Sequence, residues 1–138
     1  MKRKPTFHLI GDSTMQSYAE SKRPQFGWGE FLLESLYPKL SQTISQDPNR
    51  VFEQEKNYEN QVLKIVNHAM AGRSMKTFTN EKRLEPVKDL IQTGDYLFIQ
   101  FAHNDCNEEK KERYLTPDAF AKSLQDFIAI ARQKQATA

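Results

Sequence analysis

Ser13, Gly72 and Asn104 are the residues whose types and placement fit one reaction, the attack of a hydroxyl group on a carbonyl carbon. Each follows a short apolar segment that is predicted to be a buried strand. Ser13 offers a hydroxyl, Gly72 a backbone N–H that a substrate oxygen can approach closely, and Asn104 a side-chain amide donor. Together they could supply a nucleophile and an oxyanion hole.

Each of these motifs has a second interpretation when it is taken alone. Gly11-Asp12-Ser13-Thr14 is also typical of a turn with a side-chain cap, Gly72 of an ordinary loop, and Asn104-Asp105 of a common turn pair. Their placement after successive strands favours the chemical interpretation. In an open α/β sheet, ligands bind beyond the carboxyl ends of the strands.

The predicted strands lie at 6–10, 62–66 and 96–101, which are rich in β-branched and aromatic residues. Helical patterns separate them, and this favours parallel strands with crossover helices. The intervening segment 41–61 is polar and is expected to be a surface excursion.

Three helices are predicted, at about 28–37, at about 81–92, and after Thr116 as N-cap with Pro117 in the first turn. Their apolar stripes predict which side chains face the sheet. These are Trp28, Phe31, Leu32 and Leu36 in the first helix, Leu84, Val87, Leu90 and Ile91 in the second, and Phe120, Leu124, Phe127, Ile128 and Ala131 in the third.

The length of the chain fits a single domain over residues 1–138. A net charge of +2 does not favour nucleic acid as a partner, and no apolar stretch is long enough to span a membrane. The single cysteine, Cys106, excludes an internal disulfide. With no signal peptide after the basic start, we expect a cytoplasmic protein, or a secreted one if a leader was removed.

Further short motifs accompany the three already described, from Phe7 to Ala136. They are Phe26-Gly27-Trp28-Gly29, Asn67-His68-Ala69, Gly72-Arg73-Ser74, Thr77-Phe78, Gly94-Asp95-Tyr96, Gln100-Phe101 and His103-Asn104-Asp105. In this set and order the sequence resembles the SGNH (GDSL-type) hydrolase superfamily, and within it rhamnogalacturonan acetylesterases and related carbohydrate acetylesterases.

The resemblance implies a flavodoxin-like three-layer α/β/α fold, with the three strands in the order second, first, third. It implies cleavage of acetyl esters on pectic or related saccharides through an acyl-serine, without a cofactor or metal. Ser13 would be the nucleophile. The N–H groups of Ser13 and Gly72 and the side chain of Asn104 would hold the oxyanion, while Asp12 would organise the turn.

Two features depart from the family's pattern. Ala102 stands where the family usually has glycine, and it would strain the loop before Asn104 if that position needs a positive φ. The family's Asp-x-x-His block, which supplies the base, has no counterpart here. We therefore expect a truncated chain that is inactive or impaired. The alternative is a non-catalytic module with this fold that binds a sugar or a protein, or a decayed paralogue.

The three histidines do not replace that base in any evident way. His68 is the better candidate for a contact at the edge of the site, while His103 is expected to face away from Asn104 as a structural hydrogen-bonding residue. His8 lies within the first strand, and no spacing of histidines and Cys106 matches a known metal site. Without a base, Ser13 is a poor nucleophile.

The third strand would form an edge of the sheet in this chain. An edge that is rich in Phe and Ile favours association with other chains. We therefore expect the 138-residue chain to be marginally stable or to associate with itself.

Overall fold

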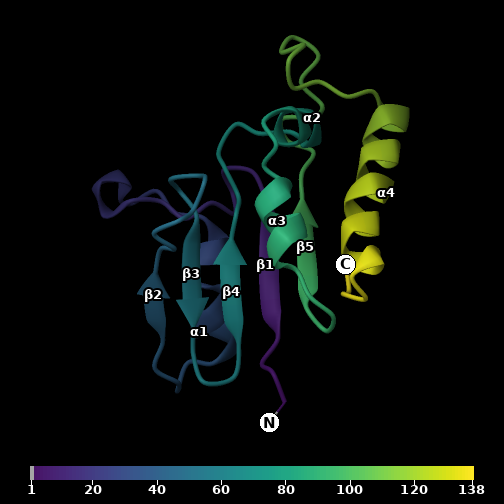
Figure 1. Cartoon of the computed structure of the whole chain (residues 1–138). Coiled ribbons are helices and arrows are strands. Elements are labelled where there is room, and N and C mark those ends of the chain that lie inside the picture. The colour runs from purple at the N-terminus through teal and green to yellow at the C-terminus, as the bar shows by residue number, and fades with distance from the viewer. Residues whose placement is uncertain (1) are drawn as a thin grey trace.

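The computed structural model of this protein describes residues 2–138 and contains a five-stranded mixed sheet in the order β2-β3-β4-β1-β5 (Figure 1). The strands are β1 (Thr6–Gly11), β2 (Thr43–Ser45), β3 (Lys56–Glu59), β4 (Lys64–Asn67) and β5 (Tyr96–Gln100). β1 pairs in parallel with β4 on one side and β5 on the other. The predicted order of the three parallel strands is therefore confirmed.

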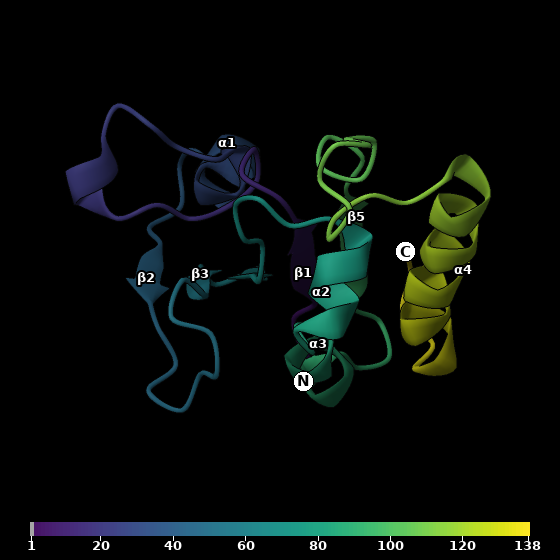
Figure 2. The ribbon, with the colours of Figure 1, turned by 90° about the horizontal axis from the view of Figure 1, so that it is seen from above.

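Helices cover both faces of the sheet. Successive residues of β1 point to opposite faces, so Leu9 and Ile10 belong to two different cores. Leu9 packs with Leu33 of α1 (Leu32–Leu36), and Ile10 with residues of α2 (Met75–Asn80), α3 (Glu85–Leu90) and α4 (Pro117–Gln133). Figure 2 shows α1 on one side of the sheet and α2 and α3 on the other, which is the predicted three-layer arrangement.

The polar segment 41–61 contributes two antiparallel strands, which the sequence did not predict. β2 pairs with β3, and β3 pairs with β4. The sheet is therefore mixed rather than wholly parallel. One side chain of this segment, Tyr58, is buried, and its hydroxyl lies 2.8 Å from Ser17 Oγ. The segment thereby packs against the loop that follows β1.

The first predicted helix is present in two pieces, the 3₁₀ helix η2 (Trp28–Glu30) and α1. A separate 3₁₀ turn, η1 (Glu20–Lys22), precedes them. Leu33 is the fully buried residue of α1, whereas Phe31 and Leu36 are exposed, so the predicted inward face was wrong at both positions. The tighter 3₁₀ turn changes the phase of the side chains that follow it.

The second predicted helix was also placed differently. Helix α2 begins after Ser74, whose hydroxyl accepts the Thr77 N–H, and the sequence did not predict this element. A break follows at Lys82, where φ is 58°, before α3 begins. Val87 is buried as predicted, but Leu90 is exposed.

Helix α4 confirms the strongest start signal in the sequence. Thr116 is its N-cap, and the Thr116 hydroxyl accepts the Ala119 N–H at 3.2 Å. Phe127 and Ala131 are buried as predicted, together with Ile130, which was not predicted. Among residues 2–138, none of the helices combines the length and the apolar character that crossing a membrane requires.

β5 lies at the edge of the sheet, as expected. The backbone beyond α4 returns beside the first residues of this strand, where Leu97 N donates to the Thr137 carbonyl at 2.7 Å. Tyr96 and Thr137 form an isolated parallel bridge. Leu97 of β5 belongs to the core beneath α2, α3 and α4. The Tyr96 and Phe98 rings lie on the other face of the strand, where they contact Phe7 and remain partly exposed.

Candidate active site

The loop after β1 presents Ser13 on a turn that Asp12 organises. The Asp12 carboxylate accepts the Thr14 N–H at 3.0 Å and the Thr14 hydroxyl at 2.9 Å. The Tyr18 hydroxyl donates to the Ser13 carbonyl at 2.8 Å. Within residues 2–138, neither the Ser13 N–H nor its hydroxyl forms a hydrogen bond. The turn therefore leaves both groups of Ser13 available to a ligand.

Close packing holds this turn from behind. The buried Asn67 amide donates to the Met15 carbonyl at 2.8 Å and to Ser17 Oγ at 2.9 Å. A side chain on Gly27 would overlap the Gln16 carbonyl oxygen, so only glycine allows these two backbone segments to touch. Two of the motifs that carry the family resemblance therefore position the Ser13 loop.

Gly72 lies in the loop after β4, beside the Ser13 loop. The Met70 N–H donates to the Gly11 carbonyl at 3.0 Å, and the Ala71 N–H donates to Gln16 Oε1 at 2.6 Å. These two bonds hold the loops together just before Gly72. Gly72 has a φ of 76°, a conformation that favours glycine. Its N–H has no hydrogen-bond partner within residues 2–138.

Asn104 follows β5 and is buried against the Gly72 loop. Its Nδ2 donates to the carbonyl oxygen of Arg73, the residue after Gly72, at 2.9 Å. Ala102 has a φ of 130°, so the positive φ under which strain was expected at this position is present. The structure thus brings Ser13, Gly72 and Asn104 to one edge of the sheet, at the carboxyl ends of its three parallel strands.

Asp105 fixes the loop that carries Asn104. Its Oδ1 accepts the Met75 N–H at 2.8 Å and its Oδ2 accepts the Ala102 N–H at 3.1 Å. Burial raises the pKa of this carboxyl group above its usual range, against the effect of the backbone donors. Asp105 therefore ties α2 to the end of β5.

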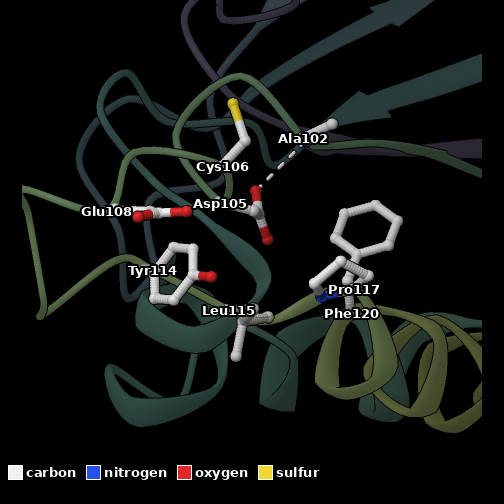
Figure 3. Close-up of a pocket in the computed structure, with 8 residues that line it drawn as sticks. All are labelled: Ala102, Asp105, Cys106, Glu108, Tyr114, Leu115, Pro117 and Phe120. Carbon is white, nitrogen blue, oxygen red and sulfur yellow. Dashed lines mark hydrogen bonds between the residues drawn. The ribbon is translucent and has the colours of Figure 1, made fainter.

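A pocket of about 260 Å³ lies beside Asp105, between this loop and the start of α4. Figure 3 shows the Asp105 side chain in the middle of the lining residues, with its hydrogen bond to Ala102. The exposed thiol of Cys106 is also at this pocket. Ser13, Gly72 and Asn104 do not line it, so the pocket adjoins the candidate site rather than containing it.

The histidine predicted at the edge of the site lies elsewhere. His68 is buried and pairs with Glu55 through Nδ1 and with His8 through Nε2, so the prediction of a contact with the site was wrong. The loop before β3 delivers Glu55 and covers His68. His103 is exposed and faces away from buried Asn104 as predicted, but its imidazole forms no hydrogen bond within residues 2–138.

Sequence reasoning missed the side chains that hold the loops of the site together. Gln100 Oε1 accepts the Trp28 Nε1–H at 2.7 Å and the Thr14 hydroxyl at 3.1 Å, while Gln16 links to Ala71. A further side chain, Arg113, donates to Asn104 Oδ1 at 3.1 Å. No periodicity or local motif marks such contacts between loops.

Within the described residues, no three histidine, cysteine or carboxylate side chains are grouped so that they could hold a metal ion.

Comparison with known families agrees with this arrangement. The family model described as "GDSL-like Lipase/Acylhydrolase" matches residues 8–137. The chain belongs to this family. Membership in the GDSL-like family confirms the resemblance that the motifs indicated, and it covers all three loops of the site.

Two relatives of this GDSL-like chain come from Bacillus subtilis (strain 168). "Probable rhamnogalacturonan acetylesterase YesY" is 37% identical over 130 residues, which cover 94% of this chain and 49% of the relative. "Rhamnogalacturonan acetylesterase RhgT" is 33% identical over 136 residues, or 99% of this chain and 47% of the relative. The chain thus spans about half the length of these curated relatives.

Solved structures share the GDSL-like fold. The crystal structure of protein YxiM from Bacillus subtilis matches with a TM-score of 0.69 and 25% identity, over 99% of this chain and 33% of that one. A variant of Axe2, an acetyl xylan esterase from Geobacillus stearothermophilus, matches with a TM-score of 0.56 and 14% identity, over 96% of this chain and 57% of that one. The second likeness concerns the fold alone.

Proposed function

We propose that this domain acts in the hydrolysis of acetyl esters on a saccharide, with Ser13 as the nucleophile. The observation that carries the proposal is the pair of unpartnered backbone N–H groups, at Ser13 and Gly72, on loops that hydrogen bonds hold side by side. Unpaired N–H groups at such a position are what an oxyanion hole requires. The printed names of the two Bacillus relatives support an acetylated saccharide as the substrate.

In the proposed reaction, the Ser13 hydroxyl attacks the acetyl carbonyl carbon, and the carbonyl oxygen becomes an oxyanion. The N–H groups of Ser13 and Gly72 and the free N–H of the Asn104 amide donate to that oxyanion. The sugar leaves with a proton, and water then releases acetate from the acyl-serine. In this reaction Ser13 acts as the nucleophile and the three N–H groups act as hydrogen-bond donors, and no step uses a metal or cofactor.

The proton of the Ser13 hydroxyl needs an acceptor. Residues 2–138 place no imidazole or carboxylate in a hydrogen bond with Ser13 Oγ, so the proposed reaction requires a base that these residues do not supply in this arrangement. The same observation favours the second candidate function, a module with this fold that binds an acetylated saccharide without cleaving it.

Hydrolysis of a small aryl acetate tests the proposal, with the chain compared to its Ser13→Ala variant. Ser35→Ala is the matched control, because Ser35 is exposed on α1 and its hydroxyl forms no hydrogen bond within residues 2–138. Hydrolysis that Ser13→Ala abolishes and Ser35→Ala preserves supports the esterase. Acetate release from acetylated rhamnogalacturonan and acetylated xylan then compares the two substrates.

Equal background rates for all three proteins would contradict catalysis by this chain. The same proteins then test the binding module by titration with an acetylated oligosaccharide and its deacetylated form. Binding that requires the acetyl group and is retained in Ser13→Ala would favour the module.

A further inference from the structure

The loop between Asp105 and α4 contains Arg113, whose guanidinium group reaches the proposed oxyanion donors. Arg113 Nη1 donates to Asn104 Oδ1 at 3.1 Å. A Cβ built on Gly72 would lie 3.8 Å from Arg113 Nη2, so the guanidinium lies near that glycine, across the space that a side chain would occupy. One cation therefore binds Asn104 and lies near Gly72.

Hydrogen bonds on both sides of Arg113 hold this loop in place. The Lys76 ammonium group of α2 donates to the Lys111 carbonyl at 2.9 Å. The Leu115 N–H donates to the Asp105 carbonyl, also at 2.9 Å. These anchors lie two residues to either side of Arg113, and the Arg113 N–H donates to the Lys110 carbonyl at 2.8 Å. Together the three bonds restrict the backbone from which the guanidinium reaches Asn104.

The partners of Asn104 determine which way its amide faces. Arginine can only donate a hydrogen bond, and the Arg73 carbonyl can only accept one. Asn104 therefore satisfies both only with Oδ1 toward Arg113 and Nδ2 toward the Arg73 carbonyl. The opposite orientation would set donor against donor and acceptor against acceptor. The observed orientation leaves the second N–H of Nδ2 for a ligand.

The charge of Arg113 also acts on this amide. A cationic donor on Oδ1 polarises the carboxamide and strengthens the N–H groups as donors. The nearest carboxylate, Glu112, lies 3.8 Å from Arg113 Nε and is largely exposed, so water screens that pair. Glu112 therefore offsets little of the positive charge of the guanidinium.

We propose that Arg113 is a positioning residue, which orients and polarises the Asn104 amide for the oxyanion. This role rests on the proposed esterase function of the same site. It predicts that Arg113 acts through Asn104, so removing Arg113 should have no effect once Asn104 is gone.

A double-mutant cycle on aryl acetate hydrolysis tests this dependence. Asn104→Ala should lower kcat about 10²–10³-fold, and Arg113→Met about 10–10²-fold with little change in KM. Adding Arg113→Met to Asn104→Ala should change kcat by less than about twofold. Equal fold-changes in both backgrounds, or an effect on KM alone, would overturn the proposal. Arg132→Met, at an exposed arginine near the end of α4, is the matched control.

A measurement without turnover separates the inference from the proposed function. The Asn104 side-chain amide gives two signals in an ¹⁵N-correlated NMR spectrum, identified by their loss in Asn104→Asp. We expect Arg113→Met to shift both signals and to speed exchange of these protons with water, whereas Arg132→Met leaves them unchanged. Unchanged signals in Arg113→Met would overturn the positioning role even if the chain proves to be no esterase.

Discussion

Nδ1 of His8 lies 3.2 Å from Nε2 of His68, and the two buried rings meet edge to edge, with nearly parallel planes and their centroids 5.5 Å apart. Beyond the pair, His68 meets Glu55, and His8 Nε2 lies 3.4 Å from Asp95 Oδ2. Arg3 ends the series with an ion pair to Asp95 at 2.7 Å. A chain of ionisable groups thus crosses the interior away from Ser13, which makes the histidines part of the fold rather than of the proposed chemistry.

Stability should fall in mild acid because of His8. Burial, together with the neighbouring His68, lowers the pKa of His8 from 6.5 to about 4. Between these pH values the unfolded chain binds a proton at His8 that the folded chain does not bind. The free energy of unfolding should therefore decrease from pH 7 to pH 4, by up to about 3 kcal/mol from this group. Urea unfolding across this range measures it.

Two substitutions isolate the contribution of His8. His8→Gln removes the titrating group and should flatten the decrease, even if the variant is less stable at pH 7. His103→Gln should keep the pH dependence of the original protein, because His103 is exposed. The same decrease in His8→Gln as in the original protein would show that other groups cause it.

Ala102→Gly should stabilise the fold. Ala102 has a φ of 130°, where a Cβ is strained and glycine is not. Relief of that strain should raise the free energy of unfolding by about 1 kcal/mol, which denaturant unfolding can detect. Ala121→Gly in α4 should do the opposite by a similar amount. If both variants were destabilised, the strain at Ala102 would be negligible.

Asp105→Asn should destabilise the chain even though it removes a buried charge. Both carboxylate oxygens accept backbone N–H groups, from Met75 and Ala102. An asparagine can accept only one of them and would turn its own N–H₂ toward the other. A loss of about 1–3 kcal/mol is expected in thermal or urea unfolding. At exposed Asp118, the same change should cost less than about 0.5 kcal/mol.

The strands that the sequence predicts best are those with nearly continuous runs of apolar and aromatic residues, such as β1 and β5. β1 is buried on both faces, as central parallel strands are, whereas one face of β5 remains partly exposed. β3 reads Lys56-Asn57-Tyr58-Glu59, and a single apolar residue leaves no alternation to detect. Its strand character comes from pairing with β4, which a local pattern does not record.

The candidate site divides in a similar way. Ser13, Gly72 and Asn104 are predictable because each follows a recognisable strand, and the topology brings these ends together. Arg113 is not predictable, since it contacts Asn104 from a loop without regular structure. The prediction for His68 was wrong because a position after a strand suggests exposure, whereas Glu55 arrives from a distant segment and covers it.

Self-association through β5 remains a prediction, and the edge strand now identifies the side chains to change. Tyr96 and Phe98, beside Phe7, are 41% and 37% exposed. The outer edge of β5 is paired only at its start, where Tyr96 forms a bridge with Thr137. Phe98→Lys should shift sedimentation toward the monomer, because a charge there opposes pairing of edges. Ile44→Lys places the same charge on β2, the other edge, where no aromatic cluster is present among the described residues. A monomer at all concentrations, or an equal effect of both variants, would contradict association through β5.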